Sequence, residues 1–183
     1  MGNKVTFTPG FCLLSALGLL VLPLRWAFGS VLAALVHELA HCLAVWLCGG
    51  QILSVTLGGH GAVMEASPMT SGKEAVCALA GPVGSLSVLL IGKYFPEAAI
   101  CALAQGIYNL LPFYPLDGGR VLRALFSRHV CCAVEVFFCV FLPGFLLWIG
   151  TQNGEIGMMM LLILSFAFIR GKITCKEPQL AVQ

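Results

Sequence analysis

The sequence predicts an all-α integral membrane protein, with about six transmembrane helices and a membrane-embedded β-hairpin or re-entrant loop after the second of them. Two observations predict this fold class. First, 59% of the 183 residues are hydrophobic, only 10% are charged, and the mean hydropathy is +0.96. Soluble domains carry about 25% charged residues, and a soluble core of this size could not bury so much apolar surface. Second, the apolar residues gather in runs that approach the length of a membrane span.

Six apolar segments are candidate transmembrane helices, because a helix needs about 20 apolar residues to cross the hydrocarbon core. No small-residue cleavage site follows the first segment, so we expect it to be retained rather than removed as a signal peptide. Pro143 and Gly144 are expected to kink the fifth. We expect one multi-pass membrane domain over residues 1–183, with a polar cytoplasmic tail at residues 171–183. The six segments are residues 10–24, 26–47, 73–91, 96–111, 130–149 and 156–169.

The stretch "GGQILSVTLGGHGAVMEASP" between the second and third segments has a different composition. Glycines surround a short β-branched run at residues 52–57, which favours a β-hairpin or re-entrant loop over a helix. Backbone of this kind at membrane depth must be covered by protein or face a water-filled cavity. We therefore expect an edge strand at residues 51–57 that captures an extended partner segment by strand addition.

The basic residues predict the orientation in the membrane. If the N-terminus is cytoplasmic, eight of the ten Lys and Arg residues fall inside, and only Arg25 and Lys93 fall outside. The positive-inside rule then places both termini in the cytoplasm. The small size and the lack of a eukaryotic-type domain favour a bacterial cell membrane. No basic run is long enough to predict a nucleic-acid partner, and the nine cysteines are expected to be small buried hydrophobic residues.

The second segment contains the motif "HELAH", in which His37, Glu38 and His41 interrupt an otherwise apolar helix. Residues four apart lie on one face of a helix, so both imidazoles can bind one zinc ion. In H-E-x-x-H motifs the glutamate is not a ligand but accepts a proton from the metal-bound water. A charged residue at the centre of a span costs about 2.5–3.5 kcal/mol, which zinc binding at about 10–16 kcal/mol could offset. The alternative is that neutral histidines join neighbouring helices by hydrogen bonds.

A catalytic zinc site needs a third protein ligand and an open position. Asp117 is the first candidate, because it follows two helix-stopping prolines at the inner end of the fourth segment. His37 and His41 lie in the inner half of the second segment, so all three side chains can meet near the cytoplasmic side. His60 could also approach the site, whereas His129 is expected to face solvent at a membrane boundary.

Three motifs together resemble the signatures of the site-2 protease family of intramembrane zinc metalloproteases. They are "HELAH", "ALAGPVGSL" at residues 78–86 and "NLLPFYPLDGGR" at residues 109–120. The resemblance covers residues 26–125, which we expect to be the catalytic core. The six-span layout is similar to the branch that contains a sporulation protease acting on a membrane-tethered sigma-factor precursor, in a minimal form without a PDZ or CBS domain.

The resemblance implies a metalloendopeptidase that hydrolyses a peptide bond in or next to a transmembrane segment of a membrane-tethered protein, as in regulated intramembrane proteolysis. A membrane inhibitor or regulatory protein is a candidate partner, and the Gly81-Pro82 pair would pack around the active site. The residues that the resemblance assigns are the zinc ligands His37, His41 and Asp117, the general base Glu38, and the substrate-binding residues Asn109, Gly58 and Gly59.

Two other functions and several structural roles remain as alternatives. A zinc transporter would need polar groups at several depths, and a catalytically inactive membrane scaffold would be expected to lose part of the His-Glu-His-Asp set. Asn109 could instead join two helices by a hydrogen bond. Glu135 is an intramembrane carboxylate that could equally pair with Arg128 or Arg123, and His60 could be an ordinary loop residue.

Overall fold

The computed structural model describes residues 4–58 and 61–153. The predicted sixth span at residues 156–169, the tail at residues 171–183, Gly59 and His60 lie outside the described residues. The chain divides into two units, Met1–Arg128 and His129–Gln183. The motifs that predict a metal site all belong to the first unit.

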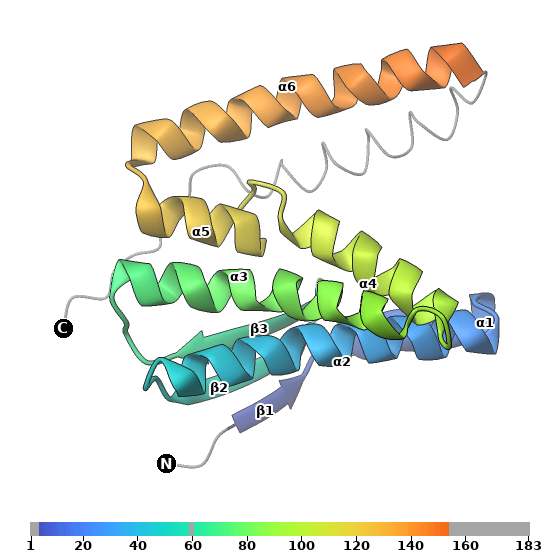
Figure 1. Cartoon of the computed structure of the whole chain (residues 1–183), viewed down its shortest axis with the longest axis horizontal. Helices are drawn as coiled ribbons and strands as arrows, with labels where there is room; N and C mark the ends of the chain where they lie inside the picture. The colour runs from blue at the N-terminus through green and yellow to red at the C-terminus, as the bar shows by residue number, and fades with distance from the viewer. Residues whose placement is uncertain (1–3, 59–60, 154–183) are drawn as a thin grey trace. The chain divides into compact units, whose positions relative to one another are not determined.

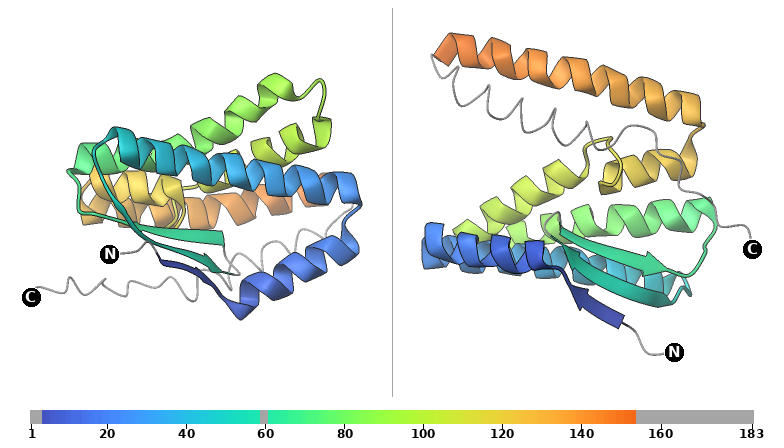
Figure 2. Two further views of the ribbon diagram at one scale, coloured as in Figure 1. Left: turned by 90° about the horizontal axis from the view of Figure 1, so that it is seen from below. Right: turned by 180° about the vertical axis from the view of Figure 1, so that it is seen from behind.

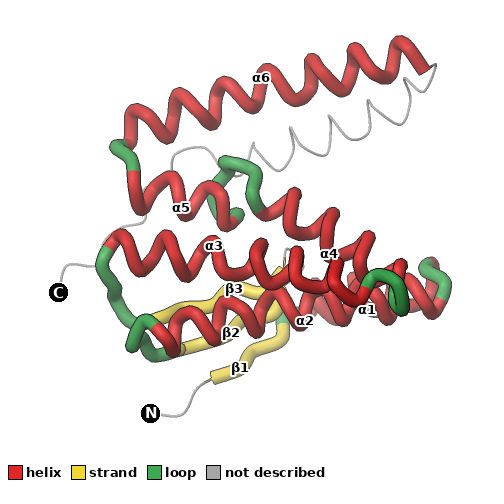
Figure 3. Tube along the Cα trace, viewed as in Figure 1, coloured by secondary structure: helices red, strands yellow, loops and turns green. Residues whose placement is uncertain are grey.

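The elements of the first unit alternate between helices and a small sheet (Figures 1 and 3). The second unit contributes one long helix that continues through Pro143, α6. In chain order the elements are β1 (Lys4–Phe7), α1 (Pro9–Val21), α2 (Leu24–Leu47), β2 (Ile52–Gly58), β3 (Gly61–Ala66), α3 (Ser71–Ser87), the short 3-10 helix η1 (Val88–Ile91), α4 (Pro96–Asn109), α5 (Asp117–Leu125) and α6 (Arg128–Asn153).

Three of the described helical segments are long and apolar enough to cross a membrane: α2, α3 continued by η1, and Arg128–Phe145 of α6. They correspond to the second, third and fifth predicted spans. The first and fourth predictions fall on α1 and α4, which have 13 and 14 residues. A helix of this length reaches about 21 Å, against a hydrocarbon core of about 30 Å. The described structure therefore bears out a mostly helical membrane-type fold, and six full spans remain a prediction.

Helix α2 buries a stripe of residues at four-residue intervals, Gly29, Ala33, His37, His41 and Val45. Small residues in this stripe allow neighbouring helices to approach closely. A Cβ on Gly29, for example, would lie 2.9 Å from the backbone nitrogen of Ala98 on α4. The two histidines therefore stand on the face of α2 that is packed against protein.

The opposite face of α2 exposes large apolar side chains, including Leu35, Leu39 and Leu43. Helix α2 thus buries its histidines and exposes its leucines, which is the reverse of the usual arrangement in a soluble protein. This distribution suits a helix whose outer face contacts lipid and whose inner face carries the polar chemistry.

The sheet has three strands in the order β1-β2-β3. Strand β1 pairs with β2 in parallel, with Val5 opposite Val55, and β3 pairs with β2 antiparallel. The right panel of Figure 2 shows the sheet in front of α2, and Ile52 and Met64 pack on the buried cluster that includes Ala44.

This arrangement corrects two sequence-based predictions. The predicted all-α class becomes a mostly helical fold with a small sheet, because the sheet has three strands rather than a hairpin alone. Residues 51–57 do not form an edge strand, because β2 is the central strand and both of its edges are paired. The physical reason is the four-residue strand Lys4–Phe7, which lies about fifty residues earlier and is too short to be recognised by its own pattern. An antiparallel strand pair does follow α2, and its depth in the membrane remains a prediction.

Candidate metal centre

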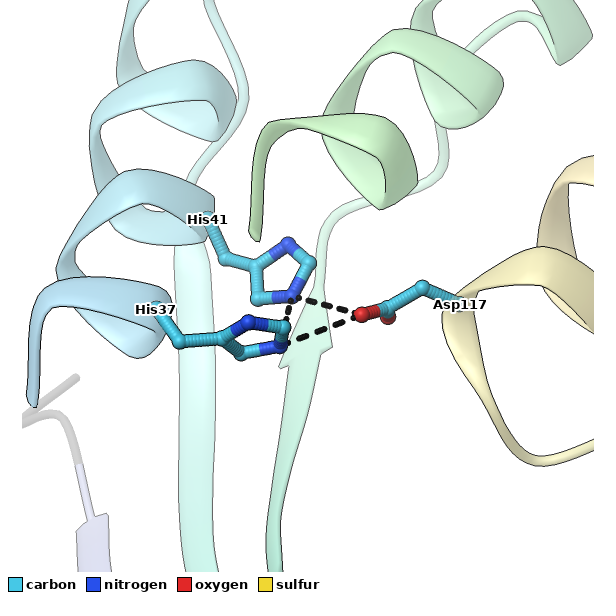
Figure 4. Close-up of side chains that lie close together, drawn as sticks. All are labelled: His37, His41 and Asp117. Carbon is cyan, nitrogen blue, oxygen red and sulfur yellow. Dashed lines mark hydrogen bonds and ion pairs between the residues drawn. The ribbon is translucent and has the colours of Figure 1, made fainter. Parts of the chain in front are cut away.

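His37 and His41 project from the buried stripe of α2 and meet Asp117, the first residue of α5 (Figure 4). The Nε2 atoms of the two histidines are 3.2 Å apart. Oδ2 of Asp117 lies 3.1 Å from Nε2 of His37 and 3.2 Å from Nε2 of His41. All three residues are less than 10% exposed, at 3%, 8% and 6%. Segments more than seventy residues apart thus bring three metal-binding side chains to one buried point.

The size of this triangle fits a tetrahedral zinc ion. With zinc–nitrogen and zinc–oxygen bonds of about 2.0–2.2 Å, adjacent ligand atoms of a tetrahedron are about 3.3–3.6 Å apart. The three observed separations are 3.1–3.2 Å, so little movement is needed to place the atoms at bonding distance. Three protein ligands leave a fourth tetrahedral position for water or substrate, as catalytic sites require.

The hydrogen bonds of His41 also favour a cation at this point. Nδ1 of His41 lies 2.7 Å from the carbonyl oxygen of Cys77 on α3. A carbonyl only accepts hydrogen bonds, so Nδ1 carries a proton and, in the neutral ring, Nε2 presents a lone pair. That lone pair faces the Asp117 carboxylate, which is also an acceptor. Two acceptors at this distance need a shared proton or a metal cation between them.

Asp117 is held ionised in this environment. Burial by itself would raise the pKa of the Asp117 carboxyl, but in the shared-proton arrangement the hydrogen bonds donated by the His37 and His41 rings outweigh burial and lower that pKa to about 2. Arg120 adds a positive charge one helical turn away, with Nη1 3.9 Å from Oδ1 of Asp117. The carboxylate is therefore available as an anionic ligand at neutral pH.

The loop before α5 fixes the position of Asp117. Residues 110–116 fold back tightly, and the backbone nitrogen of Leu116 donates to the carbonyl of Phe113 at 2.8 Å. A Cβ on Gly118 would collide with the carbonyl of Leu110, and one on Gly119 would collide with the backbone of Phe113. The glycines after the aspartate therefore allow the start of α5 to pack directly on this loop.

Glu38 follows His37 on α2 but is only partly buried and is not one of the three converging residues. An H-E-x-x-H spacing places the glutamate beside the ligands without making it a ligand. Its side chain is only partly covered by the protein. This placement suits a group that exchanges protons with water at a neighbouring metal.

The resemblance implied that Gly81 packs around the site, but sequence reasoning missed two other contributions of α3, Ser85 and the carbonyl of Cys77. The fully buried Ser85 has its Oγ 2.8 Å from Nδ1 of His37, and the carbonyl of Cys77 bonds His41. A Cβ on Gly81 would collide with Nε2 of His41, so this glycine leaves space for the imidazoles. A polar residue in the apolar run "AGPVGSL" was the available signal for Ser85.

The other predicted site residues are not in this group. Asn109 ends α4, and its Nδ2 donates to the carbonyl of Gln105 in the same helix at 3.1 Å. Gly58 ends β2 and lies opposite Gly61 in β3. Their substrate-binding roles stay predictions.

Comparisons with known proteins show that the chain is similar to peptidases. The model of peptidase family M50 matches residues 60–142. Rip3 of Mycobacterium tuberculosis is 35% identical over 130 residues, which cover 57% of this chain and 33% of Rip3. Stage IV sporulation protein FB of Bacillus subtilis is 28% identical over 141 residues, which cover 69% of this chain and 49% of that protein.

A zinc metalloprotease of Methanocaldococcus jannaschii is 24% identical over 182 residues, which cover 90% of this chain and 54% of that protein. This chain thus spans about a third to about a half of the length of these curated relatives. The solved structure of a site-2 protease from Methanocaldococcus jannaschii superposes with a TM-score of 0.61 at 20% identity, over 97% of this chain and 93% of that one. This last likeness is a likeness of fold.

Proposed function

We propose, from the premise that this chain belongs to the site-2 protease family, peptidase family M50, that it is an intramembrane zinc metalloprotease. It would hydrolyse a peptide bond in or next to a transmembrane segment of a membrane-tethered protein. The observation that carries the proposal is the buried group of His37, His41 and Asp117, which lies partly on a helix long enough to span the membrane.

In this proposal each polar residue of the centre has a separate role. His37, His41 and Asp117 hold zinc, which would polarise the scissile carbonyl and lower the pKa of a water molecule to about 7. Glu38 accepts the proton of that water and returns it to the leaving amine. Its partly exposed position supports this role, because a general base must exchange protons with water inside an apolar environment.

The substrate must present an extended segment, since a transmembrane helix hides its amides in internal hydrogen bonds. With β2 central, the outer edges of β1 and β3 are the sheet edges without a partner strand among the described residues. Either could pair with an unwound substrate by strand addition. Asn109, Gly58 and Gly59 remain candidate substrate-binding residues on the basis of the family resemblance.

We further propose a cell-membrane location with a multi-pass topology, both termini in the cytoplasm and the zinc centre nearer the cytoplasmic side. The basic residues support this orientation through the positive-inside rule. Residues 26–125 would be the catalytic core of a single membrane domain, in a bacterial membrane, with residues 171–183 as its cytoplasmic tail.

The direct test is Glu38→Gln in the full chain, co-expressed with a single-span tethered reporter. Because Glu38 is not a ligand, the variant should bind zinc as the parent does and lose cleavage by about 10²–10⁴-fold, the usual contribution of a general base. Glu74→Gln is the matched control, since Glu74 is exposed in the first turn of α3. Full cleavage by the Glu38 variant would refute the general-base role.

The same experiment separates the two alternative functions. A zinc transporter would move zinc into vesicles without cleaving the reporter, and an inactive scaffold would do neither. The described residues contain one group of three metal-binding side chains, whose ligand atoms lie within 4.8 Å of one another, whereas a transport path would need several such groups along the membrane. This observation favours the protease.

A further inference from the structure

Ser85 on α3 is a buried polar residue that has no role in the mechanism proposed above. Its side chain is fully buried, and its Oγ lies 2.8 Å from Nδ1 of His37 across the interface between α3 and α2. On another side, a Cβ on Gly106 of α4 would lie 3.4 Å from the Cβ of Ser85. Ser85 is thus confined between two helices, with its hydroxyl directed at a histidine of the metal centre.

Other serines in the membrane helices behave differently. Ser30 and Ser87 each donate to a carbonyl three residues earlier in their own helix, Ala27 and Gly84 respectively. This local bond is a common way for a serine to satisfy its hydroxyl inside a helix. Ser85 instead bonds a residue 48 positions away, and that bond is made to a ring whose other nitrogen faces Asp117.

The two histidines have partners of different chemistry at Nδ1. His41 faces a carbonyl, which accepts only, so the proton of a neutral His41 ring stays on Nδ1. His37 faces a hydroxyl, which can either donate or accept. The partner of His37 therefore allows both neutral tautomers, whereas the partner of His41 allows one.

This difference matters when the centre gains or loses its metal. Without metal, a proton on Nε2 of His37 can be donated to Oδ2 of Asp117 at 3.1 Å, and the Ser85 hydroxyl then donates to Nδ1. With metal, Nε2 must present its lone pair, so the ring proton moves to Nδ1 and is donated to Oγ of Ser85. The histidine keeps one proton throughout, and only the direction of the Ser85 bond reverses.

We propose that Ser85 is a positioning residue of the metal centre, whose hydroxyl reverses its hydrogen bond with His37 when the metal binds. This inference rests on the proposed zinc centre. Ser85 orients the His37 ring in both states. If the proton of His37 were fixed on Nδ1, the metal-free ring would present a lone pair to the Asp117 carboxylate, and the Ser85 hydroxyl avoids this unfavourable contact by accepting either tautomer.

The first test compares Ser85→Ala with Ser87→Ala, its neighbour on the same helix, in the purified full chain in detergent. Zinc affinity, measured by competition with a chelator, should fall about 10–100-fold for Ser85→Ala, as is usual when the partner of a ligating histidine is removed, and should stay unchanged for Ser87→Ala. The visible absorption spectrum of the cobalt-substituted Ser85 variant should also shift, because the orientation of one ligand changes. Equal zinc affinity and an unchanged cobalt spectrum would overturn the proposal.

The second test needs no substitution at Ser85, so it holds even if that variant folds poorly. Nitrogen NMR of the ¹⁵N-histidine-labelled parent should show the His37 proton on Nε2 without metal and on Nδ1 with zinc. His41 should keep its proton on Nδ1 in both states. A His37 proton on Nδ1 in both states would refute the reversal.

Failure of the underlying function has a different signature. If the parent protein binds no zinc under any condition, both the proposed function and the proposal for Ser85 are refuted. A parent that binds zinc and cleaves its reporter, but whose zinc affinity is indifferent to Ser85→Ala, would end the Ser85 inference alone.

Discussion

Replacing Gly81 with alanine should abolish zinc binding, although Gly81 itself supplies no ligand atom. The added Cβ would collide with Nε2 of His41, the atom proposed to bind the metal. It would also lie 2.5 Å from Cε1 of His41 and 2.8 Å from Cε1 of His37. One methyl group therefore presses on both imidazoles from the α3 side.

The size of the required movement decides the outcome. Ordinary contact to a Cβ begins at 3.4 Å, so the 2.5 Å contact leaves the His41 ring 0.9 Å too close. Metal sites tolerate departures of only about 0.2 Å in ligand distance. The ring cannot move this far and keep both its bond to Cys77 and its place in the ligand triangle. Overpacking should also cost about 1–3 kcal/mol of stability.

The assay measures the zinc content of the purified full chain and cleavage of the tethered reporter in parallel. Gly72→Ala is the matched control, because Gly72 lies in the first turn of the same helix and has no neighbour within 4 Å of an added Cβ. Gly81→Ala should contain little zinc and show no cleavage, while Gly72→Ala should match the parent. Parental zinc content and activity in Gly81→Ala would show that the helix spacing used in this reasoning is wrong.

Two further substitutions separate the chemistry of the centre from the packing of the helices. Asp117→Asn removes the anionic ligand, so zinc affinity measured by competition with a chelator should fall. The fall should exceed the loss of about 10–100-fold that is usual when a residue supporting a ligand is removed. Unchanged affinity would exclude Asp117 as a ligand. Gly29→Ala places a Cβ 2.9 Å from the backbone nitrogen of Ala98, which cannot move aside easily, so denaturation should show a loss of about 1–3 kcal/mol with zinc content retained. Gly18→Ala, which meets nothing within 4 Å, is its control and should leave stability unchanged.

The family and the membrane character were predictable from local patterns. The three motifs resemble the signatures of the site-2 protease family, and the comparisons agree with this resemblance, since peptidase family M50 matches residues 60–142 and a solved site-2 protease has a similar fold. Apolar runs at residues 26–47 and 73–91 coincide closely with α2 and with α3 continued by η1, because a membrane span is encoded by a continuous stretch of sequence. The runs at residues 10–24 and 96–111 also form helices, but composition alone does not reveal that these helices are shorter than a span.

The sheet shows where local patterns stop being sufficient. A glycine-flanked β-branched run predicts a strand at residues 52–57, and the structure has β2 there. Whether that strand lies at an edge depends on what pairs with it, and its second partner is a four-residue strand near the N-terminus. Nothing in the sequence of either strand specifies this long-range pairing.

The sequence by itself determined that His37 and His41 share one face of a helix, because their four-residue spacing is a property of the helix alone. It also predicted Asp117 as the third member of the group, and the structure brings that side chain to the two histidines. Only the tertiary structure decided that Ser85 and the carbonyl of Cys77 contact the two imidazoles, and how closely Gly81 approaches them. The physical reason is that these contacts depend on the distance and rotation between α2 and α3, which the packing of small side chains sets across the interface.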